Sequence, residues 1–196
     1  MDKKKLANIV SAVMNAPLIT LLTFVPLVFR YGGVSTIRVL TITSFFGCVL
    51  PLILVVLMLK KGVITDFYAT ERMERFIPFM ATIASYSFGA LALIITDAPA
   101  PITALMACYI VNGLVLLVIT LKWKISIHAS GIASPVTALV YLLGSRLIFL
   151  FLLFIPVAWA RVELNAHDKK QVTAGAIISG VLTWVQMAFY VHYVFI

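Results

Sequence analysis

The chain has 196 residues, of which 63% are hydrophobic and only 11% are charged. Soluble domains carry about a quarter charged residues, so this composition excludes a soluble globular protein and indicates an integral membrane protein. The net charge of +8 fits basic residues that flank membrane spans and meet anionic lipid head groups, and nucleic acid is not an expected partner.

Long apolar runs without period-two alternation predict transmembrane helices rather than barrel strands. A helix needs about 20 residues to cross a bilayer. In chain order, runs close to this length occupy 7–29, 38–59, 76–95, 102–121 and 171–195. We therefore expect one integral membrane domain over 1–196, with an all-α, polytopic transmembrane helical bundle of six to seven spans.

The stretch 129–163 is apolar except for the tripeptide Gly144-Ser145-Arg146. A lone arginine in the middle of the bilayer costs at least ~2.5 kcal/mol, whereas a turn at the tripeptide removes that cost. We therefore predict two short helices, 129–145 and 146–163, and seven helices in all.

The basic residues predict the orientation of this seven-helix bundle. Twelve of the 15 lysines and arginines fall on the side of the N-terminus, and only Arg30, Arg38 and Arg146 fall on the other. Because short cytoplasmic loops carry an excess of basic residues, we expect the N-terminus and the loops on its side to be cytoplasmic.

Three polar clusters share this basic side. Arg72 and Arg75 are spaced to grip one anion from a helix. The other two clusters are Lys124, Ser126 and His128, and then Arg161, His167 and Gln171. Each cluster alone is typical of a topology anchor or a structural histidine. Together they bring two titratable rings and at least three guanidinium groups to one side of the membrane, which suits phosphate chemistry.

The order and spacing of these residues resemble the type 2 phosphatidic acid phosphatase (PAP2) superfamily of membrane lipid phosphatases over about 72–171. The family's third motif, Ser-Arg, five residues, His, three residues, Asp, is similar to Ala160-Arg161, five residues, His167, three residues, Gln171. Its second motif, Pro-Ser-Gly-His, is similar to Ile125-Ser126-Ile127-His128. Its first motif, Lys, six residues, Arg-Pro, is matched loosely by Arg72, Arg75 and Pro78. The resemblance implies a PAP2-like catalytic core over about 66–195.

The resemblance also implies a role for each matched residue. His167 would attack phosphorus and form a phosphohistidine, and His128 would protonate the leaving oxygen and later activate water. Arg161, one or both of Arg72 and Arg75, and the Ser126 hydroxyl would hold the phosphate oxygens, with Lys124 as a further candidate. No metal or other cofactor would be needed.

Gln171 departs from the family pattern, because an amide can orient the His167 ring but carries no charge to stabilise it. Glu163 or Asp168 could replace the missing carboxylate, although we interpret both as solvated loop residues. We expect substitution of Gln171 by aspartate to raise activity or leave it unchanged.

The leading hypothesis is thus a membrane phosphatase that acts on a lipid phosphate or a polyprenyl (pyro)phosphate. A catalytically inactive member that binds lipid phosphate is one alternative, and a non-enzymatic transporter is another. All seven acidic residues lie outside the apolar cores, which argues against an ion-coupled carrier. A haem carrier that uses His128 and His167 is also disfavoured, because paired haem histidines normally project from facing helices.

Overall fold

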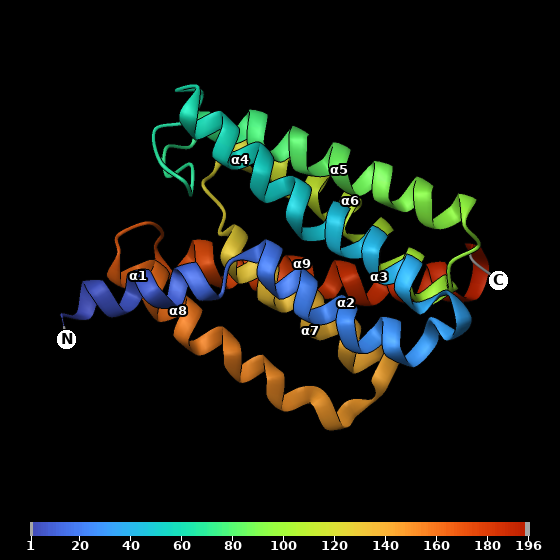
Figure 1. Ribbon diagram of the computed structural model, residues 1–196. Helices are drawn as coiled ribbons and strands as arrows, with labels where there is room; N and C mark the ends of the chain where they lie inside the picture. Colours follow the sequence, from blue (N-terminus) through green and yellow to red (C-terminus); the bar gives the residue numbers. More distant parts are fainter. Residues whose placement is uncertain (1, 195–196) are drawn as a thin grey trace.

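Helices form the whole framework of the protein (Figure 1). The computed structural model describes residues 2–194, and this part of the chain contains no strand. Among these residues, five helical segments are long and apolar enough to cross a membrane, and a bent pair near the N-terminus raises the number to six. The all-α fold class with several candidate spans is therefore confirmed.

Nine α-helices lie within residues 2–194. They are α1 (Lys3–Val13), α2 (Ala16–Tyr31), α3 (Thr36–Ser44), α4 (Leu50–Lys60), α5 (Phe76–Ile95), α6 (Ala100–Lys122), α7 (Ile127–Leu143), α8 (Phe154–Glu163) and α9 (Lys169–Phe189). Shorter 3₁₀ segments cover Gly33–Ser35, Met73–Arg75 and Ser145–Leu153, and π-helical turns cover Phe45–Val49 and Tyr190–Val194. We call the end where α4, α6 and α8 finish and α5, α7 and α9 begin the basic end.

The predicted first span, 7–29, is two helices instead of one. α1 and α2 meet at an angle of 45°. Asn15 makes the break, because its amide nitrogen donates to the Ala12 carbonyl (2.8 Å) while its oxygen accepts from the backbone N–H of Leu18 (3.0 Å). One side chain thus closes α1 and caps α2. Pro17 follows in the first turn of α2, where a backbone N–H would have no partner within the helix, so proline is well tolerated there.

The second predicted span, 38–59, is a continuous helical segment from Gly33 to Lys60 that contains a π-helical turn at Phe45–Val49. Pro51 stands just after this turn and has no N–H to donate to the carbonyl four residues earlier. A locally wider helix is a common response to such a missing bond.

The predicted turn between two helices in 129–163 is confirmed. α7 ends at Leu143, and Gly144 adopts a φ of 106°, a conformation that glycine accepts readily. The chain then returns through Ser145–Leu153 and α8, which Figure 1 shows as a separate arm beside the bundle. As a result the start of α7 and the end of α8 both lie at the basic end.

α7 and α9 pack closely because small residues line their contact. Ser134 and Thr183 hydroxyls are 2.7 Å apart across the interface, and the amide of Asn112 on α6 donates to Thr183 (2.8 Å). Gly175 lies against the backbone of Ser126, where a β-carbon would be only 2.5 Å from the Ser126 carbonyl oxygen. Small residues and side-chain hydrogen bonds of this kind join helices in membranes.

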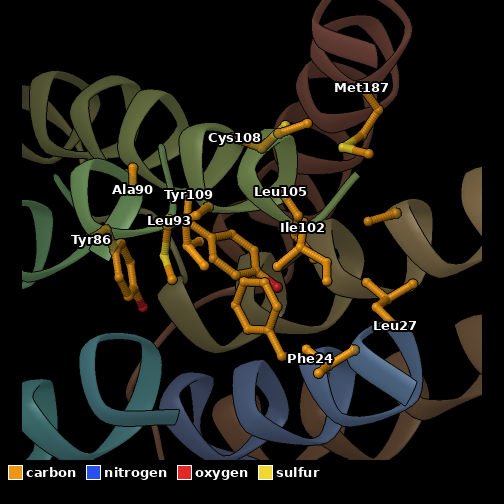
Figure 2. Close-up of a cluster of buried hydrophobic side chains, with 14 of the residues drawn as sticks. Phe24, Leu27, Tyr86, Ala90, Leu93, Ile102, Leu105, Cys108, Tyr109 and Met187 are labelled. Carbon is orange, nitrogen blue, oxygen red and sulfur yellow. The ribbon is translucent and has the colours of Figure 1, made fainter. Parts of the chain in front are cut away.

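The largest hydrophobic core occupies the half of the bundle away from the basic end. Figure 2 shows its aromatic centre, where Phe24 and Tyr109 pack edge to face with ring centroids 5.9 Å apart. Large apolar side chains such as Leu22, Val118 and Ile155 are exposed on the outside of the helices. An apolar exterior around a packed apolar core is what a lipid environment requires.

Candidate functional site

Two arginines and two histidines line one cavity at the basic end. They are Arg75 before α5, His128 in the first turn of α7, Arg161 in the last turn of α8, and His167 in the loop between α8 and α9. The cavity has a volume of about 200 Å³. All four side chains are buried, and the two arginines are each only 2% exposed.

His167 is held with one ring nitrogen directed at the cavity. Its Nδ1 lies 2.9 Å from Oε1 of Gln171, an oxygen that can only accept, so Nδ1 carries the proton and Nε2 keeps its lone pair, which faces Arg75 at 3.5 Å. The loop between α8 and α9 is held to the end of α8, because the backbone N–H of His167 donates to the Arg161 carbonyl (3.2 Å). Burial, and then the charge of Arg75, lower the pKa of His167 to about 4. The ring is therefore neutral near pH 7, as a nucleophile must be.

Asp168 does not replace the carboxylate that the family pattern places at Gln171. It is the N-cap of α9, and its oxygen accepts from the backbone N–H of Gln171 at 2.8 Å. This bond fixes the first turn of α9 and therefore the position from which the Gln171 side chain reaches His167. Asp168 is an exposed residue outside the helices, as we expected, and it has this capping role in addition.

Arg75 is fixed by backbone carbonyls. Its Nε donates to Ala69 (2.9 Å), and one terminal nitrogen donates to Ile125 (3.0 Å). The other terminal nitrogen lies 3.5 Å from Nε2 of His167. The guanidinium group therefore stands beside the ring nitrogen of His167 that carries no proton.

Arg161 and His128 are linked through Tyr68, a residue of the loop between α4 and α5. The Arg161 guanidinium lies over the Tyr68 ring at 5.4 Å from the centroid, and the His128 ring packs edge to face against it at 5.3 Å. Nε of Arg161 and Nε2 of His128 are buried and have no hydrogen-bond partner. Two buried polar nitrogens at the wall of a cavity are costly unless a ligand satisfies them.

No carboxylate neutralises the two buried arginines through the hydrogen bonds that the structure records. Every acceptor of Arg75 and Arg161 in residues 2–194 is a neutral carbonyl, hydroxyl or ring nitrogen. Asp66 interacts with both arginines through its charge, but its carboxylate oxygens accept from Tyr68 and Thr70 and not from either guanidinium group. Two buried cations without a paired anion form a site for an anionic ligand.

Three of the predicted phosphate-binding residues lie outside this cavity. Arg72 points away and donates to the carbonyls of Thr120 (3.2 Å) and Leu121, where it satisfies the C-terminal end of α6. Ser126 is the N-cap of α7, and its hydroxyl oxygen accepts from the N–H of Ala129 (3.4 Å).

Lys124 is half-buried and does not line the cavity. Burial and the nearby Arg75 lower the pKa of Lys124, so its charge adds to the positive field without facing the ligand space. Among the predicted phosphate-binding residues, Arg75 and Arg161 are therefore the ones that the fold brings to the two histidines.

Sequence reasoning missed Tyr68 and Ser11. Tyr68 stands in a loop whose conformation depends on Asp66. Ser11, whose hydroxyl accepts from Arg161 (3.3 Å), is one of several polar residues in the first apolar run. An acidic residue followed four positions later by threonine is a weak turn signal that could have indicated an ordered loop. Nothing in the sequence marks Ser11.

An apolar chamber continues from the four residues into the bundle. Its walls come from α2, α4, α5, α6 and α7, and its deep end lies at the rings of Tyr86 and Tyr109, whose centroids are 5.6 Å apart (Figure 2). Along α5, the distance from Arg75 to Tyr86 is about 16 Å at 1.5 Å per residue. The cavity thus joins a cationic mouth to an apolar interior.

No family model, curated protein or solved structure matches this chain. The likeness to PAP2 phosphatases therefore rests on the motifs described above.

Proposed function

We propose that the protein is a membrane-embedded phosphatase that hydrolyses a lipid phosphate or a polyprenyl (pyro)phosphate through a phosphohistidine. The observation that carries this proposal is a pair of buried arginines beside two histidines at the mouth of an apolar chamber. Within residues 2–194 neither arginine has a hydrogen-bonded carboxylate. A phosphate head group supplies the missing negative charge. An apolar chain attached to it suits the chamber walls.

In the first step, the Nε2 lone pair of His167 attacks phosphorus, and the bond from phosphorus to the lipid oxygen breaks. The negative charge of the bound phosphate favours the imidazolium form of His128, which gives a proton from Nε2 to the leaving oxygen. The product is a neutral alcohol, or a lipid monophosphate when the substrate is a pyrophosphate. Arg75 and Arg161 hold the non-bridging oxygens, where donors stabilise the charge of the transition state. Gln171 keeps the proton on Nδ1 so that Nε2 stays free to attack.

In the second step, His128 removes a proton from water, and the resulting oxygen attacks the phosphohistidine. The bond between phosphorus and Nε2 breaks, inorganic phosphate leaves, and His167 regains its lone pair. His128 ends the cycle protonated, as it began. Both steps need His128 to reach the reacting oxygen, which its unpartnered Nε2 at the cavity wall can do.

The test is phosphate release by the purified protein in lipid nanodiscs from a panel of lipid phosphates and polyprenyl pyrophosphates. We expect His167→Ala to abolish both release and labelling of the protein by a substrate with radioactive phosphate. His192→Ala is the matched control, since His192 is exposed in Tyr190–Val194 and its Nε2 contacts only the hydroxyl of Tyr141 (3.1 Å). Equal release by wild type and His167→Ala contradicts the mechanism.

The inactive lipid-phosphate binder gives a different result in the same assay. Wild type would then bind inorganic phosphate with an affinity that depends on Arg75 but would release none from any substrate. The neutral Gln171 at the position of the family's aspartate is the observation that favours this second candidate.

A further inference from the structure

The N-terminal helix α1 is in direct contact with the site. α1 lies beside α8 (Figure 1), and its buried residues are Ala7 and Ser11, which stand one turn apart on the same face. Ser11 is 1% exposed, although the residues around it in the helix, such as Ala12 and Val13, are exposed. A buried polar residue on a short, otherwise weakly packed helix requires a partner.

Ser11 has two partners, and both are residues of the site. Its hydroxyl oxygen accepts from a terminal nitrogen of Arg161 at 3.3 Å. Its backbone carbonyl lies beside the ring of His128. Ser11 lies in the last turn of α1, where backbone carbonyls lack a partner within the helix and carry the partial negative charge of the helix end.

We propose that Ser11 is a positioning residue for phosphoryl transfer: its hydroxyl holds the guanidinium of Arg161 in a fixed direction at the cavity. This inference rests on the proposed function. It assigns α1, which lies outside the motif-bearing region, a direct part in arranging the site. The break at Asn15 is what ends α1 next to His128 and Arg161.

The other contacts of Arg161 do not fix the direction of its guanidinium group. Arg161 has no carboxylate among its recorded partners, and Tyr68 contacts it through a ring face, which does not fix the direction of the N–H groups. Loss of the Ser11 hydroxyl therefore frees Arg161 to rotate.

The experiment compares Ser11→Ala, Ser11→Thr and Ser85→Ala in nanodiscs, measuring kcat and KM for phosphate release. Ser85 is the matched control, because it is equally buried, donates to a carbonyl of another helix (Phe46, 2.7 Å), and lies outside the cavity lining. We expect Ser11→Ala to lower kcat about tenfold, as loss of a hydrogen bond to a charged group does. KM should change little, Ser11→Thr should recover most of the activity, and Ser85→Ala should match wild type.

Ser11→Ala is then combined with Arg161→Ala to separate positioning from a general packing defect. We expect no further loss in the double variant, because Ser11 has no guanidinium left to hold. A loss that multiplies with that of Arg161→Ala overturns the proposal, and so does a Ser11→Ala protein that behaves like Ser85→Ala.

Failure of the proposed function gives a distinct result, since wild type then releases no phosphate from any substrate. The Ser11 proposal is in that case decided by titration of inorganic phosphate into the same variants. Severalfold weaker binding by Ser11→Ala than by Ser85→Ala supports it, and equal binding overturns it.

Discussion

The hydrogen bond between Gln171 and His167 can be converted into a charged one without moving any atom. Glutamate has the same length as glutamine, so Gln171→Glu places a carboxylate oxygen at the 2.9 Å position of the amide oxygen. Aspartate is one methylene shorter and cannot keep this distance from the same backbone position. The structure thus refines the sequence-based choice of replacement from aspartate to glutamate.

The size of the effect follows from the type of bond. Charge-assisted hydrogen bonds are about twice as strong as neutral ones, a gain of roughly 1–1.5 kcal/mol for the protonated or phosphorylated ring over the neutral ring. Because one pKa unit corresponds to about 1.4 kcal/mol, the pKa of His167 should rise by about one unit from its wild-type value of about 4. The rate of phosphohistidine formation should rise about five- to tenfold above pH 6.

The assay is the pH dependence of kcat/KM together with NMR titration of His167 in wild type, Gln171→Glu and Gln171→Ala. Gln171→Ala should lower the pKa further, since the Gln171 bond favours the protonated ring. Thr173→Glu is the matched control, because it adds the same charge two residues along α9 at an exposed position. If Gln171→Glu and Thr173→Glu shift the pKa equally, the hydrogen bond does not set the basicity of His167.

Three further predictions follow from the same geometry. First, because the pKa of His167 is lowered to about 4, the acid limb of the kcat/KM profile should fall near pH 4, and a limb near 6.5 would contradict the argument from burial. The free energy of unfolding should rise with pH between about 4 and 6.5, where only the unfolded chain binds the proton, and then level off. Second, Arg75→Gln should weaken the binding of inorganic phosphate at least tenfold, and similar losses in Arg75→Gln and Arg72→Gln would show that Arg72 also faces the ligand. Arg72→Gln should leave binding nearly unchanged and lower the free energy of unfolding by about 1 kcal/mol, because it loses the hydrogen bonds at the end of α6. Third, Gly175→Ala should destabilise the protein by about 1–3 kcal/mol, because the new β-carbon would lie 2.5 Å from the Ser126 carbonyl oxygen. Thermal unfolding in detergent measures this change, and an unchanged stability would contradict the close packing of α7 on α9.

Local patterns in the sequence predicted the helices and the turn well. Apolar runs long enough to cross the bilayer predicted the helical spans, because the bilayer core leaves the backbone no other way to satisfy its polar groups. The turn at Gly144 followed from the cost of Arg146 in lipid. The contact of Gln171 with His167 was expected from the resemblance to the third PAP2 motif. The break at Asn15 was missed because a capping asparagine within an apolar run does not interrupt its hydropathy.

The composition and local spacing of the chain were thus enough to determine a helical membrane bundle and a basic end where two histidines gather. Only the tertiary structure decided which cations meet them. Arg72 and Arg75 are indistinguishable in sequence, yet one caps α6 and the other reaches His167. Ser11 is 150 positions from Arg161 along the chain and 3.3 Å from it in space. The physical reason is that hydropathy and helical period report the environment of each segment, whereas the partner of a buried polar group depends on how distant segments pack.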